Sequence, residues 1–106
     1  HWIWYIFPQL KGLGKSYYSE YYGLESIDEA VAYLKDELLS ERLISLVGIL
    51  LDEKQTKTAL EILGYTDAMK FNSCLTLFKA AVESDPELLG REEFECFGRG
   101  LGRYYI

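Results

Sequence analysis

Residues 67–83 read DAMKFNSCLTLFKAAVE, and this stretch carries the clearest periodic pattern in the chain. At about 100° per residue, one side of a helix collects six apolar side chains, namely Phe71, Cys74, Leu75, Phe78, Ala81 and Val82. Asn72, Lys79 and Glu83 share a narrow outer stripe. Because water is expected to reach so little of its circumference, the helix over 67–83 is predicted to lie at the centre of a helical domain.

A second arc of the same helix mixes polar and apolar side chains. It holds Lys70, Ser73 and Thr76, and their apolar neighbours are Met69, Leu77 and Ala80. A lysine in such surroundings either extends its amine to water or finds a partner. Two interpretations therefore stay open: Lys70 reaches solvent, or Lys70 and Ser73 line a cleft that they share with residues 1–16.

Capping motifs predict where the preceding helices begin. Ser26 and Glu29 have capping-box spacing, so a helix is expected from Ile27 onward. Its inward side chains are predicted to be Ala30, Val31 and Leu34. After a break near residues 35–39, helical spacing continues through residue 51 in Leu39, Leu43, Leu46, Val47 and Leu50. Gly48 is expected to mark close packing in this helix and not a break.

Two further starts are marked on either side of the central helix. Thr58 and Glu61 form a second capping box, for a short helix that ends at Gly64. Thr66 or Asp67 is expected to cap the helix over 67–83. The sequence SDPE at 84–87 predicts a last helix, with Ser84 and Glu87 at capping-box spacing. Its apolar face is Phe94, Phe97, Leu101, Tyr104 and Tyr105, and it is weakened by Gly98, Gly100 and Gly102.

Composition is that of one folded domain. The chain has 106 residues, of which 49% are hydrophobic and 15% aromatic. This is enough apolar surface for one core and too short a chain for two. No strand pattern with a partner is found. We therefore predict an all-α fold, a compact array of about five to seven short helices, in a single domain over residues 1–106.

Charge and cysteine usage exclude several function classes. The net charge of -6 argues against binding to nucleic acid or to anionic membranes. The longest apolar runs, 2–7 and 46–51, fall far short of the roughly 20 residues of a membrane span. Cys74 and Cys96 stand alone, so no metal site and no cofactor are expected. Free buried thiols suit a cytoplasmic location.

The first sixteen residues, HWIWYIFPQLKGLGKS, are the densest group of aromatic and glycine residues. Residues 2–6 are predicted to form a short helix that Pro8 ends at or before Phe7, followed by a loop over 8–15. Ser16 then caps a short helix over 16–22. The loop ends in GKS, but Gln9 stands where a phosphate-binding loop needs glycine. Two interpretations remain: a structural turn, or a turn that also binds a small anion.

These residues resemble the signature of an uncharacterised bacterial family catalogued as domain of unknown function 1810. The resemblance continues in the pairs 22–23, 29–30 and 33–34, in KFNSCLTLF at 70–78, and in the spaced aromatic residues after 97. It implies a compact multihelical array and no established activity. Some members are labelled calpastatin-like, a label that we set aside because calpastatins are long and disordered.

The resemblance has two further implications. Family members typically carry a helix before the His-Trp pair and a tail after the last aromatic residue, so both ends are expected to be truncated here. Apolar surface would then be exposed near Trp2 and near residues 104–106, where the chain can self-associate. Where the family usually has KLRSSMTLF, this chain has KFNSCLTLF. That departure leaves Lys70, Ser73 and Thr76 intact.

The functional hypothesis is a metabolite-binding or small-substrate domain for a small anionic ligand. Lysines on the motif-rich segments of an acidic chain suit a phosphate or carboxylate in an aromatic pocket. The expected ligand-binding residues are Trp2, Trp4, Gln9, Lys11, Gly12, Gly14, Lys15, Ser16, Lys70, Ser73 and Thr76. If chemistry occurs, His1 is the candidate acid or base, and Lys70 stabilises developing charge. The competing hypothesis is a protein–protein interaction domain that uses the same aromatic surface.

Overall fold

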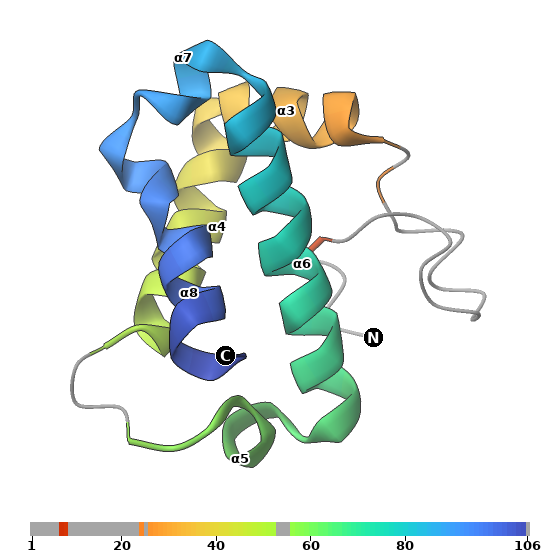
Figure 1. Ribbon diagram of the computed structural model, residues 1–106, viewed down its shortest axis with the longest axis vertical. Helices are drawn as coiled ribbons and strands as arrows, with labels where there is room; N and C mark the ends of the chain where they lie inside the picture. Colours follow the sequence, from red (N-terminus) through yellow and green to blue (C-terminus); the bar gives the residue numbers. More distant parts are fainter. Residues whose placement is uncertain (1–6, 9–23, 25, 53–55, 106) are drawn as a thin grey trace.

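The computed structural model describes residues 7–8, 24, 26–52 and 56–105. Their helices are α3 (Ile27–Lys35), α4 (Glu37–Leu50), α5 (Ala59–Leu63), α6 (Tyr65–Ser84), α7 (Pro86–Leu89), the 3-10 helix η1 (Glu92–Glu95) and α8 (Cys96–Tyr104). In this part of the chain the only extended pairing is the single bridge residue Leu24. The prediction of an all-α multihelical array is therefore confirmed (Figure 1).

Helix α6 is the central helix of the bundle. It packs against α3, α5, α7 and α8, while α4 packs against α3 and α8. Figure 1 shows α6 extending the length of the molecule beside α8. All six side chains predicted to face inward are buried, and five of them are completely inaccessible to water: Phe71, Cys74, Leu75, Phe78 and Ala81. The 3.6-residue period thus identified both the helix and its buried face.

The helices α6 and α8 run antiparallel and approach closely. The ring centroids of Phe71 and Tyr104 lie 6.4 Å apart, and those of Phe78 and Phe97 lie 5.4 Å apart in a stacked arrangement. Between these pairs, a Cβ added to Gly100 would lie only 3.0 Å from Leu75 Cδ1. Glycine at position 100 therefore lets the two helices approach at this point, although glycine is a poor helix former.

The predicted caps of α3 and α5 are present. Ser26 Oγ accepts a hydrogen bond from the Glu29 backbone N–H at 3.2 Å, and α3 begins at Ile27. Thr58 Oγ1 accepts from the Glu61 N–H at 3.1 Å, while the Glu61 carboxylate accepts from the Thr58 N–H at 3.2 Å. Both motifs stabilise a helix start by satisfying otherwise unpaired backbone donors.

The predicted break after α3 falls at Asp36. Its N–H donates to the last turn of α3, and its Oδ1 accepts from the Leu39 N–H at 2.9 Å in the first turn of α4. One residue therefore ends one helix and caps the next. Gly48 continues α4, as expected, but it is exposed, and a Cβ placed there meets no atom of the described residues within 4 Å. The expectation of close packing at Gly48 was wrong.

The central helix begins two residues earlier than predicted. Neither Thr66 nor Asp67 caps it; α6 starts at Tyr65, directly after Gly64. Gly64 has a φ of 81°, a conformation that only glycine adopts readily. Its carbonyl accepts from the Ala68 N–H at 2.9 Å. The chain therefore leaves α5 and enters α6 through a single residue, with no room for a side-chain cap.

The predicted last helix is divided into α7, η1 and α8. Asp85, and not Ser84, caps α7: its Oδ1 accepts from the N–H groups of Glu87 at 3.0 Å and Leu88 at 3.2 Å. The Ser84 hydroxyl instead donates to the Ala81 carbonyl inside α6. After four residues α7 ends, and the chain turns at Gly90 before η1. The turn lets Leu88 reach the core separately from Phe94 and Phe97, which are also buried.

Candidate functional site

Three of the predicted site residues lie on one side of α6. Lys70 and Ser73 are half-buried, and Thr76 is exposed. The Ser73 hydroxyl donates to the Met69 carbonyl at 3.1 Å, and the Thr76 hydroxyl donates to Asn72 Oδ1 at 3.1 Å. Both hydroxyl protons are thus used within the helix, and Lys70 brings a positive charge to this face. The other predicted residues lie outside the described part: His1, Trp2, Trp4, Gln9, Lys11, Gly12, Gly14, Lys15 and Ser16.

Phe7 connects the amino-terminal stretch to α6. Only 4% of its surface is exposed, and its ring centroid lies 4.7 Å from that of Phe71. In Figure 1, residues 7–8 form the short red segment beside α6. Phe71 directly follows Lys70 in the sequence. The structure thus packs one residue of the 1–16 stretch on the helix that carries Lys70 and Ser73.

The two cysteines are free and buried, as predicted. Burial raises the pKa of the Cys74 thiol well above its usual value and that of Cys96 to about 11. Both thiols are therefore neutral at physiological pH, which makes them packing groups and poor nucleophiles. The described residues contain no cluster of three or more His, Cys, Asp or Glu side chains that could hold a metal ion.

Two tyrosines tie the end of α8 to other helices. The Tyr105 hydroxyl donates to the Ala68 carbonyl at 2.5 Å, and the Tyr104 hydroxyl donates to the Leu50 carbonyl. Burial is the larger cause that raises the pKa of Tyr105 to about 12, and the electrostatic effect of the neighbouring Tyr104 acts in the same direction. Both rings are half-buried. Hydrogen bonds and ring packing thus cover part of both side chains, while Trp2 and Ile106, where exposed apolar surface was also expected, lie outside the described residues.

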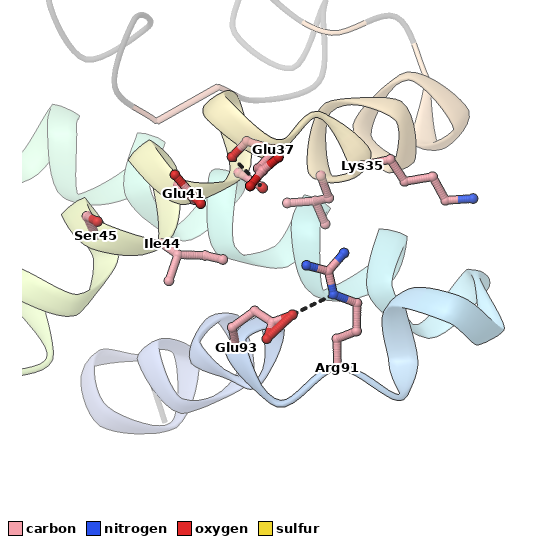
Figure 2. A pocket seen from close by; sticks show the side chains of 9 residues that line it. Lys35, Glu37, Glu41, Ile44, Ser45, Arg91 and Glu93 are labelled. Atoms are coloured by element: carbon pink, nitrogen blue, oxygen red, sulfur yellow. Dashed lines mark hydrogen bonds and ion pairs between the residues drawn. The ribbon is translucent and has the colours of Figure 1, made fainter.

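A groove that the sequence analysis missed lies between α4 and the segment around Arg91 (Figure 2). It has a volume of about 620 Å³, and its lining residues are Leu34, Lys35, Glu37, Ser40, Glu41, Ile44, Ser45, Arg91 and Glu93. The four-residue spacing of Glu37 and Glu41 indicates that both lie on the same side of a helix. Arg91 and Glu93 follow fifty or more residues later, so only the tertiary structure brings them to the same place.

None of the helices in the described part of the chain is long and apolar enough to cross a membrane.

Comparison with known proteins gives a family but no activity. No curated protein matches the chain. The crystal structure of a conserved hypothetical protein, Rv1873 from Mycobacterium tuberculosis, is similar, with a TM-score of 0.79 and 38% sequence identity over 99% of this chain and 68% of that chain. The sequence profile of DUF1810, described as a protein of unknown function, matches residues 1–104. With almost its whole length matched, the chain belongs to the DUF1810 family.

Proposed function

We propose that this protein binds a small anionic metabolite or substrate between residues 1–16 and α6. The observation that carries the proposal is the packing of Phe7 on Phe71, with ring centroids 4.7 Å apart. It brings one residue of the aromatic and glycine-rich stretch into contact with the helix that carries Lys70. Lys70 is half-buried as a residue. A charge that is partly shielded from water gains more from an anion than a fully solvated one does, because water screens it less.

The remaining predicted residues supply what such a ligand needs. Trp2 and Trp4 offer apolar surface for the body of a ligand. Backbone N–H groups at Gly12 and Gly14 are suitable donors to a phosphate or carboxylate. Further polar groups come from Gln9, Lys11, Lys15 and Ser16, and from Ser73 and Thr76 on α6. If the ligand is a substrate, His1 is the candidate acid or base.

A thermal-shift screen against phosphorylated and carboxylated metabolites tests the proposal. A specific ligand stabilises the folded state by mass action, so the melting temperature keeps rising with ligand concentration. Replacing Lys70 by Met removes one charged hydrogen bond and should weaken binding by about 1.5–3 kcal/mol. Lys79→Met is the matched control, because Lys79 lies on the same helix but pairs with Glu83 at the exposed surface.

Equal effects of the two substitutions would contradict the proposed site. If no anion stabilises the protein, the interaction-domain hypothesis moves ahead. One observation favours that alternative: Tyr65 and Met69, one turn apart on α6, are 71% and 55% exposed. Large apolar side chains at such positions are typical of surfaces that contact another protein.

A further inference from the structure

The groove between α4 and the Arg91 segment combines an apolar floor with a charged rim. Leu34 is fully buried at its base, and Ile44 is partly buried beside it. Ser40 is only 4% exposed, and its hydroxyl already donates to the Glu37 carbonyl at 3.2 Å. Of these floor residues, Ile44 therefore supplies the accessible apolar area, and Ser40 leaves no unsatisfied hydroxyl proton there.

Arg91 is held in position on one wall. Its Nε donates to a Glu93 carboxylate oxygen at 2.5 Å, and its guanidinium carbon lies 4.7 Å from the centre of the Phe94 ring. Figure 2 shows the guanidinium directed across the groove toward α4. A guanidinium carries five N–H donors, and within the described residues only the one on Nε is hydrogen-bonded. Its terminal amino groups remain as donors to a ligand in the groove.

The opposite wall carries two carboxylates without a cation. Glu37 and Glu41 lie one turn apart on α4, and neither has an ion-pair partner among the described residues. Like charges at this spacing repel and slightly destabilise a helix. Lys35 does not relieve them, because its amine pairs with Asp85 at 3.1 Å and Glu87 at 3.5 Å. Figure 2 shows the Lys35 amine pointing away from both glutamates.

We propose that this groove binds a short basic peptide segment of a partner protein. A lysine or arginine side chain of the segment lies between Glu37 and Glu41. Backbone carbonyls of the segment accept hydrogen bonds from the terminal amino groups of Arg91, and an adjacent apolar side chain packs on Ile44. The occupant follows from charge complementarity, since the two carboxylates have no ion pair within the described part of the chain, whereas both cations of the rim already have acidic partners.

The shape of the groove favours a peptide over a small metabolite. Small-ligand sites surround most of their ligand. This groove is open to solvent, with the charged side chains of Glu37, Glu41 and Arg91 exposed on its rim. An extended segment can enter such a groove from the side and leave its ends in water. The proposal does not rest on the anion site at Lys70, because its ligand has the opposite charge.

Fluorescence anisotropy with a defined probe tests the groove. The probe is a labelled hexapeptide of alternating lysine and leucine, blocked at both ends, at about 0.15 M salt to screen long-range attraction. A peptide with glutamate in place of lysine is the control probe, and it should not bind. Replacing Glu37 and Glu41 together by Gln should weaken binding of the lysine peptide roughly tenfold or more, since the cation loses both carboxylates.

A second pair of variants separates the groove from general acidity. Asp28→Asn with Asp67→Asn removes the same net charge outside the groove and should weaken binding less than about twofold, as expected of distant, screened charges. Arg91→Lys keeps the charge but loses the planar fork of donors, so it should also weaken binding. Circular dichroism confirms that each variant is folded. Equal weakening by the two double variants, or no binding of the lysine peptide, would overturn the proposal.

Discussion

The α6–α8 interface and the corner between α3 and α7 join neighbouring helices by different means. Between α6 and α8, the rings of Phe78 and Phe97 are fully buried. At the α3–α7 corner, the amine of Lys35 lies 3.1 Å from Asp85 Oδ2, and the Lys35 side chain is 42% exposed. Water is excluded from the ring contact, whereas the charged groups of the ion pair remain partly exposed to water.

This difference shows which contacts contribute most to the stability of the fold and which can be replaced at little cost in stability. Buried aromatic area contributes strongly to folding, because it is removed from water altogether. Exposed ion pairs contribute little, because water and salt screen them. The charged corner also borders the groove through Lys35. Residues on this side can therefore be replaced with little loss of stability, because the α6–α8 interface holds the fold.

The largest effect is expected from Phe78→Ala. The side chain is fully buried, and its ring contacts those of Tyr33 and Phe97 at centroid distances of 5.4 Å. The substitution should lower the free energy of unfolding by about 3–5 kcal/mol, measured by denaturant titration. Met69→Ala on the exposed side of α6 is the control and should change it by less than about 0.5 kcal/mol. Similar losses for both variants would contradict the conclusion that the buried α6–α8 interface carries most of the stability.

Two glycines of α8 should respond to alanine with opposite signs. A Cβ at Gly102 meets no atom of the described residues within 4 Å, so alanine there should raise stability by about 0.5–1 kcal/mol through helix propensity. At Gly100 the new methyl would lie 3.0 Å from Leu75 Cδ1, and because Leu75 is fully buried, its side chain can shift only against its core neighbours. Overpacking of this kind costs about 1–3 kcal/mol, which exceeds the propensity gain.

Thermal and denaturant unfolding of the two alanine variants measure this difference. Gly100→Ala should be less stable than the wild type, and Gly102→Ala more stable. Stabilisation by both substitutions would show that α6 and α8 tolerate a wider separation at Leu75 than the structure has.

The smallest effect is expected at the α3–α7 corner and depends on pH. The pKa of Asp85 is lower than its usual value, mainly because its carboxylate accepts a hydrogen bond from Lys35. Hydrogen bonds from the backbone N–H groups of Leu88 and Glu87 lower the pKa further. The unfolded chain then binds a proton at Asp85 more readily than the folded one. The stabilisation is present above the unfolded pKa of about 3.9 and is lost as the pH falls through the lowered folded value.

Asp85→Asn isolates this contribution, because asparagine also caps helices well. The variant should be less stable than the wild type at pH 7, and the difference should shrink as the pH is lowered toward 3. Unfolding free energies measured across this range are the test. A difference that stays constant with pH would assign the loss to the cap and not to the pairing with Lys35.

Local signals predicted the helix starts that depend on neighbouring residues alone. The caps at Ser26 and Thr58 lie where the sequence placed them, since a capping box joins residues only three positions apart. The start of α6 was misplaced, because it depends on the positive φ of Gly64. The division of residues 86–104 was missed, because it follows from the burial of Phe94 and Phe97 in one core.

The candidate sites show the same limit. Lys70, Ser73 and Thr76 were assigned to one arc of a helix, and they share one side of α6. The groove was not foreseen, because Glu41 and Arg91 are distant in the sequence and no local pattern pairs them.

By itself, the sequence determined that the chain is helical, which face of α6 is buried and where α3 and α5 begin. Caps and the 3.6-residue period act within one or two turns, so neighbouring residues are enough to set them. Only the tertiary structure decided that Gly100 meets Leu75 and that Arg91 faces the glutamates of α4. Such contacts depend on how whole helices pack around a shared core, and that arrangement is chosen by the summed burial of side chains far apart in the chain.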